Sequence, residues 1–456
     1  MMLFTTNWLS TIFTANQGAI QDNKEIKEVT TDSRRNSDHS LFIPIIGEQF
    51  DGHQFIEKAI ENGAVATLWD KSKQLPDTIS TDFPVFLVDD TLKALQEMAA
   101  LYRNEVNPIV IGITGSNGKT TTKDLTAAVM KTSYKTHYTK GNFNNHIGLP
   151  LTVLSMDRNT EVLILEMGMS NFGEIDLLSH IARPDFAIIT NIGESHIEFL
   201  GSRQGIVKAK LEIINGLKKN GVLIIDGDEP LLHDLQIEQK VIDNGFLNTN
   251  TNVVSDVSIT PTGTEFNLSD GVTYKVPLLG RHHAKNASFA ITVGNLLNIA
   301  SEKSNQAFKE LELTGMRFEL IKGKNDVSII NDAYNASPTS MKASIDVVKQ
   351  MTGFKQKVLV LGDILELGNH SEALHREVAE AIEPPITALF TFGEQAKLIS
   401  DAVKEKGSIV ESVHFTSKGE LINALHMYAA KDSLLLFKAS RGLRFETIIE
   451  GIQDKE

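Results

Sequence analysis

A glycine-rich segment near residue 115 has the residue types needed to hold a phosphate chain. It starts with the apolar run 110–113, passes through Gly115, Ser116, Asn117 and Gly118, and ends with Lys119, Thr120 and Thr121. Backbone N–H groups in such a turn, with a helix N-terminus behind them, bind phosphate oxygens, and a lysine can reach the outer phosphates. The Thr120 hydroxyl is expected to hold a magnesium ion. The segment therefore predicts a nucleotide phosphate site.

The glycine spacing differs by one residue from the general pattern G-x-x-x-x-G-K-[ST]. Counting back from Gly118, the first glycine is expected at Ile113, but the chain has Gly112. The alternative is a strand-to-helix turn that binds no ligand. An apolar strand before the turn and a helical pattern from Lys123 onward favour the phosphate site.

Further candidates follow the next apolar runs. Glu166 comes directly after the run 162–165, and His196 lies in a loop after the run 186–190. The carboxyl ends of parallel strands share one edge of a sheet, so Glu166 is placed to hold magnesium beside the phosphate loop. Lys208 and Lys210 are expected to share one helix. A surface carboxylate, a satisfied polar histidine and two solvated lysines are the alternatives. Their convergence in one domain favours a catalytic centre.

The elements around these residues predict an α/β protein of three domains. In the middle of the chain, continuous apolar runs alternate with helical patterns, which is typical of a parallel sheet covered on both faces. We expect domains at 1–107, 108–313 and 314–456, the last with strands near 327–330, 357–361, 389–392 and 434–437. An amphipathic helix is expected within residues 1–17, and a β-rich stretch at 253–276.

Composition excludes several classes of function. The 456 residues carry a net charge of −14, which argues against a nucleic-acid partner or an anionic membrane surface. There is no cysteine, so disulfides, thiolate metal sites and cysteine nucleophiles are absent from the sequence. No apolar run approaches the length needed to span a bilayer. We expect a cytoplasmic protein without membrane insertion, in which local cations attract any anionic substrate.

Several motifs together resemble the Mur ligases, the ATP-dependent amide-forming enzymes of bacterial peptidoglycan precursor synthesis. The family's phosphate loop has the same offset glycine. The resemblance covers essentially the whole chain, and its motifs are 112–120, 166–168, 191–196, 208–210, 280–282 with Asn286, and 331–338.

Within the family, the segments 332–336, 362–368 and 438–441 are similar to ligases that add D-alanyl-D-alanine to UDP-N-acetylmuramoyl-tripeptide. This resemblance implies a central P-loop ATPase-like parallel sheet, a C-terminal Rossmann-like domain for the incoming dipeptide, and a small N-terminal α/β domain for the UDP-sugar. The alternatives are a Mur-type ligase for a single amino acid, an inactive nucleotide-binding relative, and a P-loop GTPase or kinase. The third residue of the acceptor peptide, diaminopimelate or lysine, stays open, and a monomer is expected.

The resemblance also implies roles for individual residues. ATP would activate a peptide carboxylate as an acyl phosphate, with Lys119, Glu166, His196 and Lys208 in catalytic roles. Magnesium would be held by Thr120, Glu166, His196 and a carbamylated Lys208, for which Lys210 is the rival. Nucleotide contacts are expected from the phosphate loop and from Asn286, Arg317, Asp332, Tyr334 and Asn335. Substrate contacts are expected from Ser33, Arg34, Asp51, Asn142, Asn145, Lys438, Ser440 and Arg441.

Overall fold

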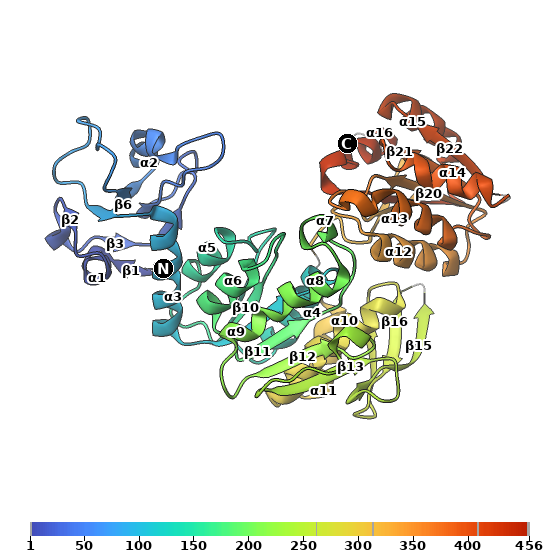
Figure 1. Ribbon diagram of the computed structural model, residues 1–456, viewed down its shortest axis with the longest axis horizontal. Helices are drawn as coiled ribbons and strands as arrows, with labels where there is room; N and C mark the ends of the chain where they lie inside the picture. The colour runs from blue at the N-terminus through green and yellow to red at the C-terminus, as the bar shows by residue number, and fades with distance from the viewer. Residues whose placement is uncertain (1, 261, 312–313, 408–409, 454–456) are drawn as a thin grey trace.

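Three sheets with flanking helices follow one another along the chain in the computed structural model (Figure 1). The structure describes residues 2–260, 262–311, 314–407 and 410–453. We call the parts around the three sheets the N-terminal, central and C-terminal domains. The N-terminal and C-terminal domains lie on different sides of the central domain, which confirms the predicted three-domain α/β class. The predicted boundary at 313/314 adjoins residues 312–313, which lie outside the described residues.

The N-terminal sheet has the strand order β2-β7-β6-β5-β4. All its pairings are parallel except that of β2 with β7. Its elements are β2 (Asn16–Gln17), β4 (Glu28–Thr30), β5 (Ser40–Phe42), β6 (Ala64–Asp70), β7 (Val85–Val88), α2 (Ile56–Glu61) and α3 (Thr91–Val106).

The helix predicted within residues 1–17 is present but covers only part of that stretch. Among the described residues of this stretch, the helix is α1 (Thr6–Ile12). It begins after Thr5, whose side chain caps the helix by accepting from the Trp8 N–H. Before it, β1 (Phe4–Thr5) pairs with β3 (Glu25–Ile26), and Phe4 is buried. Met1 lies outside the described residues. The apolar spacing therefore reflects burial of a strand and a short helix together.

The central sheet is entirely parallel, with the order β14-β13-β12-β11-β8-β10-β9. Val110 and Leu163 face one core with α3, α5 (Gly148–Leu154) and α6 (Glu174–Ala182). Ile111 and Ile164 face another with α4 (Lys119–Lys131), α10 (Arg281–Leu296) and α11 (Ser301–Lys309). Both faces are covered, as the apolar runs predicted. The strands are β8 (Ile109–Thr114), β9 (Thr136–Tyr138), β10 (Val162–Glu166), β11 (Phe186–Ile189), β12 (Val222–Asp226), β13 (Lys240–Gly245) and β14 (Asn252–Val253).

Helices and one small sheet complete this domain. The predicted β-rich stretch forms a three-stranded antiparallel sheet of β15 (Ser255–Thr260), β16 (Gly263–Asn267) and β17 (Thr273–Val276). Its apolar face contributes Phe266 and Tyr274 to the core shared with α10. The helices are α4 (Lys119–Lys131), α5 (Gly148–Leu154), α6 (Glu174–Ala182), α7 (Ile197–Leu200), α8 (Arg203–Leu211), α9 (Ile213–Gly216), α10 (Arg281–Leu296) and α11 (Ser301–Lys309).

The C-terminal sheet has the order β18-β19-β23-β20-β21-β22, and only its edge strand β18 is antiparallel. All four strands expected from the sequence are present. The strands are β18 (Glu319–Lys322), β19 (Ser328–Asn331), β20 (Gln356–Gly362), β21 (Ala388–Phe392), β22 (Glu411–Phe415) and β23 (Ser433–Lys438). The helices are α12 (Pro338–Gln350), α13 (Ser371–Val378), α14 (Lys397–Glu405), α15 (Lys418–Leu425) and α16 (Glu446–Ile452). Among the described helices, none has the length and apolar character to cross a membrane.

Candidate active site

The phosphate loop joins β8 to α4, as the sequence predicts. Two of its glycines are required by close approach. A Cβ on Gly118, whose φ is +79°, would lie 2.7 Å from the Asn286 side-chain oxygen. A Cβ on Gly115, whose φ is +150°, would lie 1.9 Å from the Thr190 hydroxyl. The loop is therefore held in a shape that only glycine allows, with the α4 N-terminus directly behind it.

Lys119 is folded back over this loop. Its Nζ donates to the Gly115 carbonyl at 2.7 Å and lies 3.4 Å from the Ser116 carbonyl. Burial lowers the pKa of Lys119, and the charge of Glu166 opposes that effect. Beside it, the Asn117 N–H donates to the Asn191 side chain at 2.8 Å. Within the described residues, the buried Asn117 amide nitrogen has no partner. The loop thus presents donors that a phosphate chain would satisfy.

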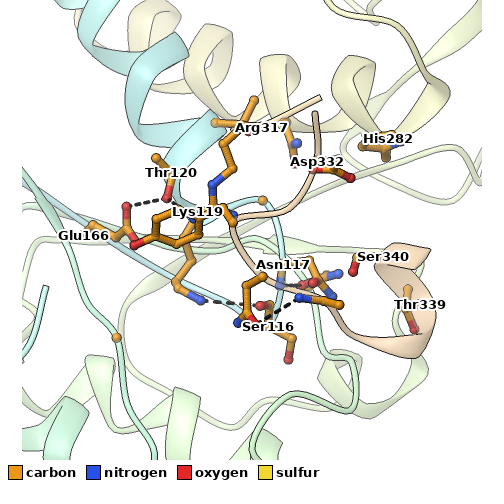
Figure 2. A pocket seen from close by; sticks show the side chains of 18 of the residues that line it. Ser116, Asn117, Lys119, Thr120, Glu166, His282, Arg317, Asp332, Thr339 and Ser340 are labelled. Carbon is orange, nitrogen blue, oxygen red and sulfur yellow. Dashed lines mark hydrogen bonds between the residues drawn. The ribbon is translucent and has the colours of Figure 1, made fainter. Parts of the chain in front are cut away.

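Thr120 and Glu166 meet at the carboxyl edge of the central sheet (Figure 2). The Thr120 hydroxyl donates to Glu166 Oε2 at 2.9 Å, and the Asn144 amide donates to Glu166 Oε1 at 2.9 Å. Glu166 is 2% exposed, and its backbone N–H donates to the Thr139 hydroxyl at 3.0 Å. Two hydrogen bonds therefore fix the Glu166 carboxylate and a third fixes its backbone, next to the first turn of α4.

The C-terminal domain supplies the opposite wall. The Arg317 guanidinium lies 4.0 Å over the Tyr334 ring and donates to the Thr120 hydroxyl at 3.2 Å. Asp332 accepts from Lys438 Nζ at 2.6 Å and from the Ser344 hydroxyl at 2.7 Å. The cavity between the two domains measures about 370 Å³, and its lining includes the phosphate loop, Asn145, Glu166, His196, His282, His283, Asn286, Arg317, Asp332, Tyr334, Asn335 and Lys438.

His196 is held at the rim of this cavity by the C-terminal domain. Its Nδ1 lies 2.5 Å from Glu366 Oε2, and both residues have a left-handed backbone, with φ of 65° and 62°. The contact with His196 lowers the pKa of Glu366 despite partial burial of the carboxylate. Non-glycine residues in this conformation persist where the surroundings enforce it, often at functional sites.

The structure separates the two candidate lysines of α8. Neither Lys208 nor Lys210 is among the residues that line the cavity, so burial alone distinguishes them. Lys208 is exposed, and its Nζ lies 5.7 Å from the Phe172 ring centroid. Lys210 is 1% exposed, and burial together with the charge of Lys119 places its pKa well below the usual value. Residues two apart on a helix point to different faces. The geometry thus favours Lys210, the rival candidate, over Lys208.

The predicted substrate residues are spread over all three domains. Two line the cavity: Lys438, and Asn145, which accepts from the Gly148 N–H at 2.8 Å. Asn142 is exposed and lies outside the lining. Ser440 accepts from the Leu365 N–H at 2.9 Å, and Arg441 pairs with Glu446 at 3.2 Å.

The N-terminal candidates do not reach this cavity. Ser33 is buried, whereas Arg34 is exposed and pairs with Asp32 at 2.8 Å. Asp51 accepts from Lys73 Nζ at 2.6 Å. The structure therefore does not bring these three residues together with the phosphate loop.

Sequence reasoning missed one residue that orients Glu166 within the central domain and several that join the two walls. Asn144 holds Glu166, the Ser337 hydroxyl donates to Asn117 Oδ1 at 3.0 Å, and the Thr339 hydroxyl donates to Glu194 at 2.8 Å. Ser337 also caps the N-terminus of α12, directly before Pro338. No local signal in the sequence predicts the hydrogen bond from Ser337 to Asn117, because the two residues are 220 positions apart.

The residues present fit a magnesium ion bound together with phosphates. Magnesium in nucleotide sites uses one or two protein ligands plus phosphate oxygens and water. Thr120 and Glu166 supply one hydroxyl and one carboxylate at the end of the phosphate loop. No group of three His, Asp or Glu side chains that could hold a metal occurs among the described residues, so the protein alone offers no complete cage.

Comparison with known proteins decides the family. The Mur ligase middle domain matches residues 113–294, the Mur ligase glutamate ligase domain matches 316–441, and the catalytic domain of the Mur ligase family matches 25–103. The chain belongs to the Mur ligase family. As a Mur ligase, it is 50% identical over 431 residues to the UDP-N-acetylmuramoyl-tripeptide--D-alanyl-D-alanine ligase of Bacillus subtilis, covering 94% of this chain and 93% of that protein.

Other Mur ligases are similar over the same length. The Escherichia coli protein of the same name is 33% identical over 439 residues and 93% of each chain. The crystal structure of MurF from Acinetobacter baumannii superposes with a TM-score of 0.86 at 28% identity, covering 98% of both chains. MurF from Thermotoga maritima in complex with ADP gives a TM-score of 0.81 at 28% identity, covering 93% of this chain and 96% of that one.

Proposed function

We propose that this Mur ligase joins D-alanyl-D-alanine to UDP-N-acetylmuramoyl-tripeptide at the expense of ATP, in peptidoglycan precursor synthesis. The observation that carries the proposal is the extent of the likeness: half of the residues match a ligase of this name across all three domains. The cavity at the domain interface supports a location for this activity, because the phosphate loop faces Arg317, Asp332 and Tyr334 across it.

The chemistry requires cations where two anions meet. ATP, when bound, supplies the phosphoryl group that converts the peptide carboxylate into an acyl phosphate. The approach of a carboxylate to a phosphate chain is repulsive, and Lys119 and Arg317 are the cations that line the cavity beside Thr120. Thr120 and Glu166 would hold magnesium there. Asn286, against Gly118, would contact the nucleotide base.

Closure of the two domains protects the activated carboxylate. Contacts of Asn117 with Ser337, Glu194 with Thr339, and Thr120 with Arg317 bridge the cavity. Such closure excludes water, which would otherwise hydrolyse an acyl phosphate before the dipeptide amine attacks it.

A carbamylated lysine would help to bind a second magnesium ion, separate from the one at Thr120 and Glu166. We place it at Lys210, because a carbamate forms from the neutral amine and the pKa of Lys210 is held well below the usual value by burial. His196, held by Glu366, would lie near this second magnesium, which would hold the substrate carboxylate. Lys208 lies on the exposed face of α8.

We assign the remaining substrate contacts to residues of all three domains. Ser33, Arg34 and Asp51 would hold the UDP-sugar, Asn142 and Asn145 the peptide, and Lys438, Ser440 and Arg441 the dipeptide, while Asp332 and Asn335 would complete the nucleotide site. We expect a monomer that acts in the cytoplasm, where ATP and the nucleotide-linked precursor occur together.

Phosphate release tests the proposal. The protein is incubated with ATP, magnesium and UDP-N-acetylmuramoyl-tripeptide, with either D-alanyl-D-alanine or single amino acids as the amine. Release that depends on the dipeptide supports the proposal. Release only with a free amino acid would identify a different Mur ligase, and no release under any condition would indicate an inactive relative.

A further inference from the structure

A buried ion pair lies in the first two turns of α4, immediately after the phosphate loop. Lys123 Nζ and Asp124 Oδ1 are 2.7 Å apart, and the two side chains are 1% and 5% exposed. Removing two charges from water is costly, and apolar residues of similar volume often serve stability as well or better. Neither residue lines the cavity described above. Stability alone therefore does not explain why two charged residues are buried at these positions.

The ion pair contacts the segment that connects the central and C-terminal domains. Asp124 Oδ2 accepts from the Thr314 N–H at 3.1 Å, and Lys123 Nζ lies 3.4 Å from the Thr314 hydroxyl. Thr314 begins the described connection that leads into β18 at Glu319. The connecting chain is thus fastened to α4 by a charge-assisted hydrogen bond, which is stronger than a neutral one.

The ion pair also contacts a residue that hydrogen-bonds to Glu166, the proposed magnesium ligand. Lys123 Nζ donates to the Thr139 carbonyl at 3.1 Å, and the Thr139 hydroxyl accepts from the Glu166 N–H at 3.0 Å. One lysine therefore contacts the connection on one side and the residue that orients Glu166 on the other.

Arg317 follows this anchor by three residues. An extended chain spans only about 3.3–3.6 Å per residue, so fixing Thr314 limits where the Arg317 backbone can lie. On the other side, the Phe318 N–H is 3.3 Å from Asp332 Oδ1 of the C-terminal domain. Between the two anchors, Arg317 reaches back to the Thr120 hydroxyl (Figure 2).

We infer that Lys123 and Asp124 are a positioning pair, which holds the domain connection so that Arg317 meets Thr120 at the phosphate site. The inference rests on the proposed ligase activity, because its effect is read in turnover. The pair itself touches neither substrate nor nucleotide. Its contribution passes through Arg317.

Two variants break the anchor in different ways. The double substitution Lys123→Met with Asp124→Leu replaces both buried charges by apolar side chains of similar size. Thr314→Pro removes the N–H donor and leaves the ion pair intact, so it tests the anchor even if the double variant fails to fold. Each is made in the natural chain and in an Arg317→Lys background, and kcat, the KM values and the melting temperature are measured.

We expect the effects on kcat of breaking the anchor and of replacing Arg317 to be strongly coupled in a double-mutant cycle. In the natural background, kcat falls by about ten- to a hundredfold, the loss expected for a misplaced catalytic group. In the Arg317→Lys background, breaking the anchor lowers kcat by less than about threefold, since coupled residues are not additive. The KM for UDP-N-acetylmuramoyl-tripeptide stays unchanged in both backgrounds.

A matched control separates positioning from stability. Tyr102→Phe removes a buried hydrogen bond from Tyr102 to the Met156 carbonyl, 2.9 Å long and remote from the connection. It should lower the melting temperature and leave kcat unchanged. Equal losses of kcat in both Arg317 backgrounds, or natural kcat in both anchor variants, would overturn the inference. Absence of turnover in the natural protein would instead overturn the proposed ligase activity.

Discussion

Arg317 of the C-terminal domain donates a hydrogen bond of 3.2 Å to the hydroxyl of Thr120 in the first turn of α4. The same hydroxyl donates to Glu166, and the Arg317 guanidinium rests on the Tyr334 ring. This contact joins the nucleotide half of the site to the half that would receive the amine. It exists only when the two domains are close, so it couples domain closure to the phosphate site.

Arg317→Ala is expected to lower kcat by about a hundredfold, the usual cost of removing one preorganised donor from an active site. Arg317→Lys should recover only part of this loss, because an ammonium group cannot reproduce the planar guanidinium stacked on Tyr334. Steady-state phosphate release at saturating substrates measures both. Natural kcat in the alanine variant would refute the role given to Arg317.

Glu166→Gln should raise the magnesium concentration needed for half-maximal activity at least about tenfold, because the amide keeps the shape but loses the charge that attracts a hard cation. The measurement is a magnesium titration of turnover at saturating ATP. Glu161→Gln on the surface before β10 is the matched control and should behave like the natural chain. An unchanged magnesium requirement in Glu166→Gln would exclude Glu166 as a ligand.

Lys210→Ala should abolish turnover, and a small carboxylic acid added to this variant should restore part of it by replacing the carbamate. Lys208→Ala should keep natural turnover, because its side chain is exposed on the other face of α8. In the natural protein, removal of carbon dioxide should reduce activity, and bicarbonate should restore it, since the neutral amine is the reacting form. The reverse ranking of the two alanine variants would return the role to Lys208.

The sequence predicts a strand or a site residue only where neighbouring residues carry the signal for it. The continuous apolar runs at 110–113 and 162–165 lie in β8 and β10, because strands buried on both faces need apolar residues at every position. Strands β9 (Thr136–Tyr138) and β13 (Lys240–Gly245) escaped prediction, because they are short or partly polar and lie at or near the edge of the sheet.

The site shows the same limit. Lys119, Thr120 and Glu166 could be predicted because each sits beside a strand end, and strand ends share one edge of a sheet. Glu366 and Ser337 could not, because their partners His196 and Asn117 belong to another domain. The choice between Lys208 and Lys210 depends on which face of α8 is buried, and two lysines separated by one residue leave that face undetermined in the sequence.

Acid should destabilise the protein through two cavity histidines. Burial lowers the pKa of His282 to about 4 and that of His283 well below its usual value. The unfolded chain binds protons at both imidazoles below about pH 6.5, whereas the folded chain keeps them neutral. Their contribution to stability is therefore complete above pH 6.5 and decreases as the pH falls toward 4.

The variant His283→Phe keeps a ring in place but cannot be protonated. Its free energy of unfolding, relative to the natural protein, should rise as the pH falls from 6.5 to 4.5, and should be nearly independent of pH above 7. The exposed His426→Gln is the control and should not change the slope. Denaturant unfolding at a series of pH values gives the comparison, and parallel curves for His283→Phe and the natural protein would contradict it.

The most direct test of the acyl-phosphate mechanism is to trace one oxygen atom of the peptide carboxylate during ligation. UDP-N-acetylmuramoyl-tripeptide is labelled with ¹⁸O in the carboxylate that accepts D-alanyl-D-alanine, and the phosphate released during ligation is analysed by mass spectrometry. If the carboxylate is first phosphorylated in the cavity between the phosphate loop and Arg317, one labelled oxygen leaves with each phosphate as the amide bond forms. Amide formation with unlabelled phosphate would contradict the acyl-phosphate mechanism and the arrangement of the site proposed for it.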